Sequence, residues 1–426
     1  MKRTLFLLAF LLLRATAVFA CTSVVVSGRA TKDGRPMMWK NTDGSLVYCA
    51  QRYSYHDEGK YAWIGLAQTP SHPVSAWFGT NETGFSIMNT SSFSHIAEKQ
   101  ERKRLNNGFL MKEALDVCVT LQDFVRLLDT IQVEKVVPGP NNFVSSHYGV
   151  IDAHGGAAYV EVKYTGGKIA YWVLDVNDPA VAPDGWLVYT NFGRYGNPDT
   201  GKGYSRYASA VKVFKEATPT RDYTPQLCLD RCARGFYRAI SGIDYRALVD
   251  QGLELGTGIV PIDDFICNDS SYQSSVVVGV KPGEDPLLTT VWAALGWPAT
   301  SVAIPLWVAG GRDGINPLLR GDPDHDNAPI CDMSLKLKTQ VYIADGPDVL
   351  RYVNFRKLYN VKGDGYMQQL APTEQAVFSF AGSYLEKWRR QGRVNRRDID
   401  KINSRVQALV LDNPLYRNLP YTYEFD

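Results

Sequence analysis

Residues 17–28 read AVFACTSVVVSG, and they place a cysteine between an apolar leader and a run of β-branched residues. A run of Val and Thr after Cys21 favours a β-strand that begins at the cysteine itself. Three explanations of Cys21 compete: a buried core residue, a lipid attachment point, or a nucleophile that becomes the first residue of the mature chain. The leader decides between them, because a segment that is removed contributes nothing to the fold.

The leader has the parts of a secretory signal peptide. Two cations at positions 2 and 3 precede nine apolar residues at 5–13, a run too short to cross a bilayer core of about 30 Å. Val18 and Ala20 are small residues at the −3 and −1 positions of a cleavage site. We therefore predict a signal peptide over residues 1–20, a secreted or periplasmic location, and no membrane association beyond export.

A cut after the signal peptide makes Cys21 the first residue, which favours the nucleophile over the buried core residue. Lipid attachment is less favoured, because Phe19 is bulky where a lipoprotein signal has a small residue. A secreted or lipid-anchored binding protein without catalysis remains the alternative from a different class.

Composition describes a globular protein with no polyelectrolyte character. The chain has 426 residues, 45% apolar residues, and 46 basic against 44 acidic side chains. Nothing in this balance indicates a nucleic-acid partner, which would need a concentrated basic face. Length alone suggests more than one simple core. We expect a main domain over 21–310 and, over 311–426, a loop plus a helical C-terminal extension packed on it.

The chain has seven cysteines, an odd number for an exported protein. If Cys21 is a working thiol, six remain and three disulfides are possible, with no pairing favoured by sequence. Zinc is disfavoured, because there is no second Cys pair at ligand spacing beside Cys228 and Cys232. A run of alternate aspartates within 322–327 starts like a calcium loop but lacks the Gly and Glu that the loop needs. We expect neither metal nor cofactor.

Periodicity predicts sheets covered by helices. Residues 21–89 and 147–175 have sequence patterns typical of strands, and so do the segments SSVVVGVKPG and TSVAIPLWVAGG. The first two strands are predicted to form a hairpin across RATKDGR. Helical spacing is seen in residues 108–131, in SRYASAVKVFKEA, in LCLDRCARGFYRAI, and in the tail over 373–412, whose many charges indicate a solvated face. The class is α+β, with packed sheets and outer helices.

A cysteine at position one carries its own base. A thiol with a pKa near 8.5 is mostly protonated at neutral pH, whereas an α-amino group with a pKa of about 7.7–8.0 keeps a useful neutral fraction. No histidine is required, and none of the six histidines lies in a setting that indicates a Cys/His pair. The second strand supplies Lys40 and Asp43 in WKNTDG. They are an odd number of residues apart, so they reach one site only if the strand ends or bends at TDG.

Several short motifs resemble the linear-amide branch of the N-terminal nucleophile (Ntn) hydrolases. That branch includes choloylglycine (bile-salt) hydrolases, penicillin V acylases and isopenicillin N acyltransferase-like proteins. The resemblance covers residues 21–217 and rests on CTSVVVSG, KNTDG, GTNETGFSIMNTSS, HYGVIDAHGGAAYVEV, VYTNFGRYG and GYSRYASA, in that order. It implies a four-layer αββα sandwich.

The resemblance also implies roles for individual residues. Cys21 would be nucleophile and, through its amine, base, while Asp43 would accept a hydrogen bond from that amine or thiol. Lys40 would stand near the thiol where bile-salt hydrolases have an arginine, and Arg206 in SRY would steady the catalytic groups. Asn191 in YTN would donate to the oxyanion.

A second oxyanion donor is expected after NETG, with Asn89 the best candidate and Asn81 a looser one. The lysine at position 40, a shorter spacing between YTN and SRY, and a C-terminal third without a counterpart all distinguish this chain from bile-salt hydrolases. We therefore expect an N-terminal cysteine hydrolase, or an acyltransferase of the same fold, acting on a small-molecule acyl amide of unspecified structure. The chain could also form a homo-oligomer.

Overall fold

The computed structural model describes residues 21–44, 51–67, 76–95, 107–130, 145–165, 168–321, 325, 327–343 and 351–419. The predicted signal peptide and Cys49 lie outside these described residues.

The strand that begins at Cys21 lies inside a six-stranded antiparallel sheet, second from one edge. In spatial order the strands are β10 (Trp186–Tyr189), β1 (Cys21–Val26), β2 (Met37–Asp43), β14 (Ser271–Val278), β15 (Thr290–Leu295) and β16 (Ile304–Leu306). The predicted hairpin is confirmed, with Cys21 opposite Thr42 and Val26 opposite Met37. Because β1 has a partner strand on each side, the position of Cys21 is fixed by the sheet.

A second, seven-stranded antiparallel sheet packs on the first. Its strands follow chain order: β3 (Arg52–His56), β4 (Trp63–Ala67), β5 (Ala76–Asn81), β6 (Ser86–Ser91), β7 (Ser146–Ile151), β8 (Ala157–Thr165) and β9 (Lys168–Asp175). The two sheets meet face to face, since β1 contacts β6, β7 and β8. Both faces of β1 are therefore buried, which explains its continuous apolar text.

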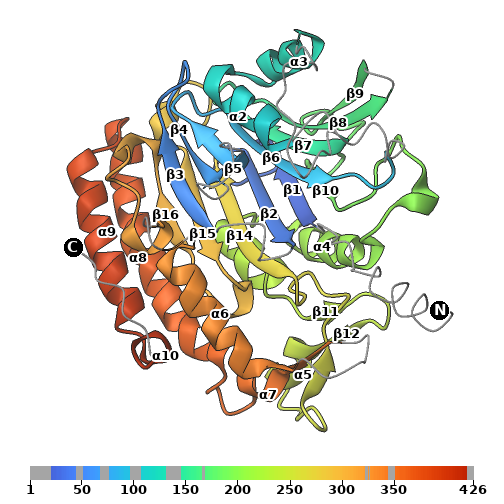
Figure 1. The fold of residues 1–426 in the computed structure, drawn as a ribbon, viewed down its shortest axis with the longest axis vertical. Coiled ribbons are helices and arrows are strands. Elements are labelled where there is room, and N and C mark those ends of the chain that lie inside the picture. The colour runs from blue at the N-terminus through green and yellow to red at the C-terminus, as the bar shows by residue number, and fades with distance from the viewer. Residues whose placement is uncertain are drawn as a thin grey trace, which may run out of the picture.

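Helices cover the outer face of each sheet (Figure 1). On the seven-stranded sheet lie α2 (Asn107–Val117) and α3 (Leu121–Thr130), which confirm the helices predicted over 108–131. On the six-stranded sheet lie α4 (Tyr204–Ala217), α6 (Pro329–Val341) and α8 (Tyr366–Gln391), with α9 (Arg396–Leu411) packed against α8. The predicted four-layer αββα architecture is confirmed.

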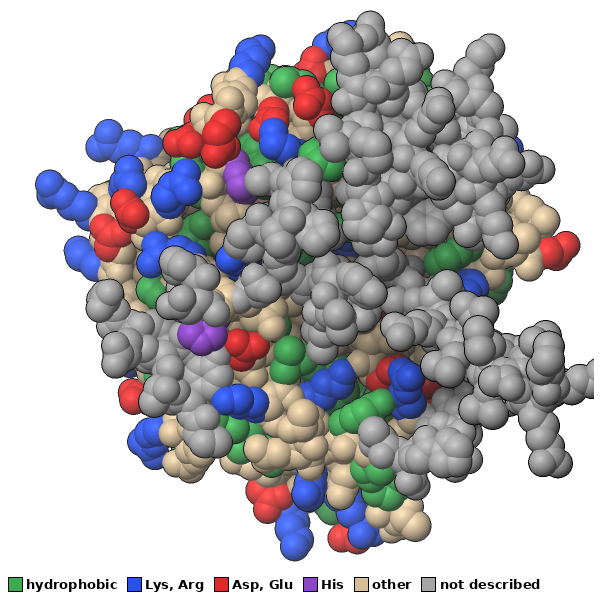
Figure 2. All heavy atoms as spheres, in the orientation of Figure 1, with side chains coloured by type: hydrophobic (Ala, Val, Ile, Leu, Met, Phe, Trp, Pro, Cys, Tyr) green, Lys and Arg blue, Asp and Glu red, His purple; other side chains and the backbone are tan. Residues whose placement is uncertain are grey.

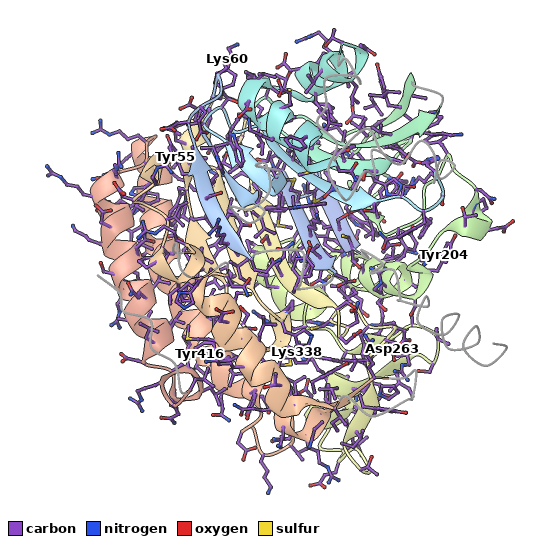
Figure 3. The ribbon with its side chains drawn as sticks, viewed as in Figure 1. Tyr55, Lys60, Tyr204, Asp263, Lys338 and Tyr416 are labelled. Carbon is purple, nitrogen blue, oxygen red and sulfur yellow. The ribbon has the colours of Figure 1, made fainter. Side chains whose placement is uncertain are left out.

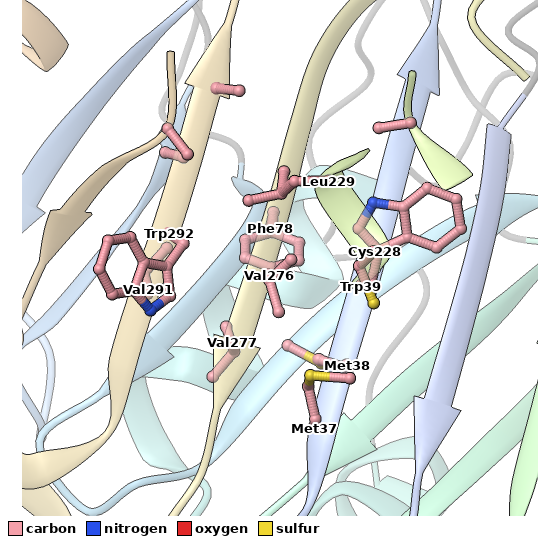
Figure 4. Close-up of a cluster of buried hydrophobic side chains, with 14 of the residues drawn as sticks. Met37, Met38, Trp39, Phe78, Cys228, Leu229, Val276, Val277, Val291 and Trp292 are labelled. Carbon is pink, nitrogen blue, oxygen red and sulfur yellow. The ribbon is translucent and has the colours of Figure 1, made fainter. Parts of the chain in front are cut away.

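The largest hydrophobic cluster joins the six-stranded sheet to helices from both ends of the chain. Figure 4 shows Met37, Val276, Val291 and Trp292 on neighbouring strands of this sheet. Trp292 stacks on Phe378 of α8 with ring centroids 3.9 Å apart. The C-terminal helices thus bury the same core as the strands, while their outer faces carry Lys and Arg side chains along one edge of the molecule (Figure 2).

A small third cluster lies beside the sandwich and was not predicted. It is built from β13 (Ile259–Pro261), β17 (Tyr342–Ile343), β18 (Tyr352–Asn354), α5 (Tyr245–Asp250) and α7 (Phe355–Leu358). The remaining short elements are β11 (Tyr237–Arg238), β12 (Ile243–Asp244), α10 (Pro414–Arg417) and 3₁₀ turns at Pro198–Thr200, Pro286–Leu288, Pro298–Thr300, Val308–Gly310 and Pro317–Leu319.

Three predictions of local structure need correction. The helix expected in LCLDRCARGFYRAI is only a six-residue π-helix, Leu227–Cys232, because the chain then turns and pairs as β11. The strand expected in TSVAIPLWVAGG is limited to β16, flanked by two 3₁₀ turns. β15 was not predicted, because its sequence, TVWAAL, is a short apolar run in which polar and apolar residues do not alternate.

The three disulfides that the cysteine count allowed are not formed by the described cysteines. Cys118, Cys228, Cys232, Cys267 and Cys331 are all buried and free. Burial raises the pKa of Cys118 and of Cys267 to about 12, so these thiols stay protonated. They behave as small apolar core residues.

Candidate active site

Cys21 lies at the start of β1 with its backbone held from the adjoining strand β10. Its thiol-bearing side chain is buried, and its backbone N donates to Asn191 Oδ1 at 3.0 Å. Asn191 follows β10 directly and forms an isolated bridge with Lys202. The structure therefore brings together the two residues that the sequence places 170 positions apart.

Arg206 connects Cys21 to Asn191 from the first turn of α4. Its Nη1 donates to the Cys21 carbonyl at 2.7 Å and to Thr22 Oγ1 at 2.9 Å, and its Nη2 donates to Asn191 Oδ1 at 2.9 Å. A Cβ at Gly203, which has φ 85°, would stand 2.6 Å from Arg206 Nη2. Glycine at the N-cap thus leaves room for the guanidinium.

A cation in the first turn of a helix opposes the helix dipole, and Asp43 compensates for it. Asp43 Oδ2 lies 3.5 Å from Arg206 Nη1. The carboxylate also accepts from Ser271 Oγ at 2.6 Å and from Asn268 Nδ2 at 3.0 Å. Burial raises the pKa of Asp43 to about 6, although Arg206, Ser271 and Asn268 all favour its charged form.

Lys40 lies between the two sheets and is fully buried. Its Nζ donates to Asn89 Oδ1 on β6 at 2.8 Å and to the Trp77 carbonyl on β5 at 3.0 Å. In the antiparallel register, Lys40 shares the face of Cys21. Asp43 points to the opposite face, toward α4, and its backbone N–H donates to the Cys21 thiol. The two residues reach Cys21 together because β2 ends at Asp43, as the sequence argument required.

The charge environment of the thiol is mixed. Burial raises the pKa of the Cys21 thiol, and the negative charge of Asp43 raises it further. Lys40, Arg206 and the hydrogen bond from the Asp43 backbone act in the opposite direction. Burial dominates, so the thiol rests protonated and needs a base beside it to attack.

Asn89 and Asn81 have different surroundings. Asn89 accepts from Lys40 through its oxygen and faces the space between the sheets. The side chain of Asn81 donates to the Leu115 and Cys118 carbonyls at 2.9 and 2.8 Å, at the end of α2. It also accepts from the turn that follows β5. The structure therefore does not bring Asn81 to Cys21.

In the full chain, the side chain of Asn191 is oriented so that its oxygen accepts a hydrogen bond from the Cys21 backbone. Its Oδ1 accepts from Cys21 and Arg206, while its Nδ2 donates to the Ser91 carbonyl at 2.8 Å. The next residue, Phe192, stacks on Tyr204 of α4 with ring centroids 4.5 Å apart. Figure 3 shows Tyr204 at the start of that helix. The aromatic pair fixes the loop that carries Asn191 to the helix that carries Arg206.

A buried carboxylate that sequence reasoning missed supports the same loop. Glu161 on β8 accepts from His95 Nε2 at 2.5 Å, from Tyr189 OH at 3.1 Å, and from the backbone N of Arg194 and Tyr195. Burial disfavours its charged form, but these partners hold its pKa at about 2. Charge-assisted hydrogen bonds to the Glu161 carboxylate therefore stabilise the conformation of the loop after Asn191.

His147 lies on β7, within the region 147–175 that was predicted to form strands. It is fully buried, and its ring lies 4.5 Å from that of Tyr189. Burial lowers the pKa of His147 to about 4, even though the charge of Glu161 opposes this.

This depressed pKa predicts acid sensitivity. Below its unfolded pKa of about 6.5, His147 takes up a proton more readily in the unfolded chain, so its contribution is full above pH 6.5 and is lost as pH falls toward 4. Against a His147→Phe variant, the wild type should lose about 3 kcal/mol of unfolding free energy between pH 7 and pH 4. Urea unfolding across this range measures it. His154→Gln, an exposed control, should leave the wild-type pH dependence unchanged.

Neither a metal centre nor a membrane span is found in the part of the chain that the structure describes. No cluster of three or more metal-ligating side chains occurs among those residues, and most of the aspartate run within 322–327 lies outside them. None of the described helices combines the length and apolar character needed to cross a bilayer.

The αββα sandwich with a cysteine at the start of an inner strand is the architecture that the resemblance to the N-terminal nucleophile hydrolases implied. More specifically, residues 29–179 match the family model described as acyl-coenzyme A:6-aminopenicillanic acid acyltransferase. The matched segment includes Lys40, Asp43 and Asn89 and stops before Asn191 and Arg206.

Similar solved structures include amide hydrolases at low identity. An N-acylethanolamine-hydrolyzing acid amidase ortholog from Caenorhabditis elegans is 15% identical, covers 61% of this chain and 92% of its own, and has a TM-score of 0.37. Two variants of conjugated bile acid hydrolase from Clostridium perfringens are each 13% identical, cover 65% of this chain and 89% of theirs, and have TM-scores of 0.33 and 0.32. No curated protein matches the chain in sequence.

Proposed function

We propose that this protein is an exported N-terminal cysteine amidohydrolase that cleaves a non-peptidic linear amide through a thioester on Cys21. The observation that carries the proposal is the set of bonds at the first residue of β1. Asn191 holds the Cys21 nitrogen, Arg206 holds its carbonyl, and Asp43 donates its backbone N–H to the thiol. In an ordinary core strand these backbone groups bond to the neighbouring strands, whereas at Cys21 side chains from a loop and a helix hold them.

Removal of residues 1–20 converts the Cys21 peptide nitrogen into an amine. The neutral amine takes the thiol proton, and the thiolate attacks the substrate carbonyl to form a tetrahedral oxyanion. The carbon–nitrogen bond then breaks, the ammonium of Cys21 returns the proton to the departing amine, and an acyl thioester remains. Water attacks the thioester with the amine again as base, releasing a carboxylic acid and restoring the thiol.

The surrounding residues have separate tasks in this scheme. Lys40 and Arg206 place positive charge near the developing thiolate, which offsets part of the cost of burial. Asn191 directs the Cys21 nitrogen through its side-chain oxygen. Asn89, whose oxygen is turned to Lys40, has its amide nitrogen available to donate to the oxyanion, a contribution worth about 3 kcal/mol per donor.

Acyl transfer is the second candidate, and the family-model match over 29–179 favours it. The two reactions share the thioester and differ only in whether water or another amine reaches it first. Adding hydroxylamine during turnover separates them. A transferase yields hydroxamate at the expense of free acid, while a strict hydrolase keeps producing the acid.

A panel of N-acyl amides tests the proposal as a whole. Bile-salt conjugates, penicillin V and N-acyl amino acids are incubated with the mature protein, and amine release is measured. At least one substrate class should be turned over. Silence across the panel, together with added acyl mass on the exported chain, would instead support the lipid-anchored binding protein.

A further inference from the structure

A second pocket lies at the end of β2 that is far from Cys21. It is a cavity of about 320 Å³ between the turn of the β1–β2 hairpin, the loop after α4, and α8. Met37 at its floor pairs with Val26, whereas Cys21 pairs with Thr42 at the other end of the strand. Five residues of strand separate the two ends, or about 17 Å.

One wall of this pocket is apolar and aromatic. Trp292 and Phe378 form a stacked pair, and Met37, Tyr223 and Leu385 continue the apolar surface. Figure 4 shows Met37 on β2 and Trp292 on β15, on either side of β14. A cavity of this size with aromatic walls suits the apolar body of a small ligand.

The rim of the pocket carries two guanidinium groups that have no carboxylate partner among the described residues. Arg221 donates to the backbone carbonyls of Ala30 and Thr31, which hold it in a left-handed conformation with φ 54°. Arg389, in the last turn of α8, makes no hydrogen bond or ion pair with any described side chain. The Arg389 guanidinium is therefore free to receive an anion, whereas the Nε and Nη2 of Arg221 are already bonded to backbone carbonyls.

The other charged side chains that line the pocket form ion pairs with one another. Arg35 is paired with Glu284 and with Asp33, and Lys32 is paired with Asp222 at 2.9 Å across the mouth. Both side chains of the Lys32–Asp222 pair are exposed, so the pair contributes little stability and opens easily. Burial and the neighbouring charge of Arg35 lower the pKa of Arg389, and the charges of Asp33, Glu284 and Glu386 offset only part of this shift.

We propose that this pocket binds a small amphipathic anion, with its carboxylate or sulfonate on Arg389 and its apolar body on Trp292 and Phe378. The site is separate from Cys21 and does not depend on the proposed amidase activity. An uncharged apolar molecule cannot pair with Arg389, and a small inorganic anion cannot cover the aromatic wall.

The probe is 8-anilinonaphthalene-1-sulfonate, an aromatic sulfonate whose fluorescence rises in apolar surroundings. It is titrated into the mature wild type, into Arg389→Gln, and into Arg390→Gln, which changes the adjacent and exposed arginine. We expect Arg389→Gln to weaken binding about 10- to 100-fold, Arg389→Lys to restore part of it, and Arg390→Gln to match the wild type. Equal affinity in Arg389→Gln and the wild type would overturn the proposal.

Competition and blocking define the ligand class and the location. Octanoate should displace the probe, whereas octanol or sulfate at matched ionic strength should not. Alkylation of Cys21 with iodoacetamide should leave the affinity unchanged. Displacement by octanol as effective as that by octanoate, or loss of binding on alkylation, would place the probe on an uncharged surface or in the Cys21 site and contradict the inference.

Discussion

Replacing Cys21 with alanine abolishes amide hydrolysis, with an expected loss of about 10⁴-fold or more in kcat because no other group can form the thioester. The fold should persist, since alanine fits a buried strand position that pairs with Thr42 on β2. Cys21→Ser should retain a small residual rate, because the hydroxyl is a much weaker nucleophile than the thiolate.

The control for this prediction is another buried thiol. Cys118→Ala changes a cysteine on the far side of the seven-stranded sheet, where burial keeps the thiol protonated. It should lower stability and leave kcat unchanged. A Cys21→Ala protein that still releases amine at the wild-type rate would exclude the thioester.

Replacing Arg206 with methionine should have the second largest effect, on stability and activity together. The substitution leaves Asp43 buried without its cation and removes the bonds to Cys21, Thr22 and Asn191. Loss of one partner of a buried ion pair costs about 3–5 kcal/mol. Activity should fall at least about 100-fold, because the backbone of the nucleophile is no longer held.

The destabilisation should depend on pH in a defined direction. The pKa of Asp43 is raised in the fold to about 6, so its contribution is full below its unfolded pKa of 3.8 and is lost as pH rises through 6. Removing Arg206 raises that pKa further, so the loss of stability should be larger at pH 8 than at pH 5. Lys215→Met, an exposed change on the same helix, should shift stability by no more than about 0.5 kcal/mol. Equal behaviour of the two variants would contradict the role assigned to Arg206.

Local sequence patterns were enough to predict the residues that lie on one hairpin and at the start of one helix. The β-branched run after Cys21 and the turn signal before β2 place Lys40 and Asp43 on the neighbouring strand. The role of Arg206 came from the resemblance in SRY, and its place in the first turn of a helix, where a cation is unfavourable, agrees with a task outside the helix.

Partners supplied by distant strands could not be predicted in this way. Asn268 and Ser271 reach Asp43 only because β14 pairs with β2 across more than 200 residues. Glu161 on β8 also meets His95, which is 66 residues away in the chain. Sequence spacing carries no information on which strands become neighbours, so these contacts needed the structure.

The two asparagines near NETG illustrate the same limit. Both Asn81 and Asn89 lie at or near strand ends in similar text, so either could supply an oxyanion donor. Three-dimensional pairing separates them, because Asn89 faces Lys40 whereas Asn81 caps the turn beside α2.

Mass analysis of the first peptide of the exported protein, after a brief reaction with a substrate from the panel, tests the central claim most directly. Our account predicts a chain that begins at Cys21 with a free amine and carries the acyl group on its sulfur. An active exported protein whose first residue lies elsewhere, or whose acyl group sits on a different side chain, would contradict it.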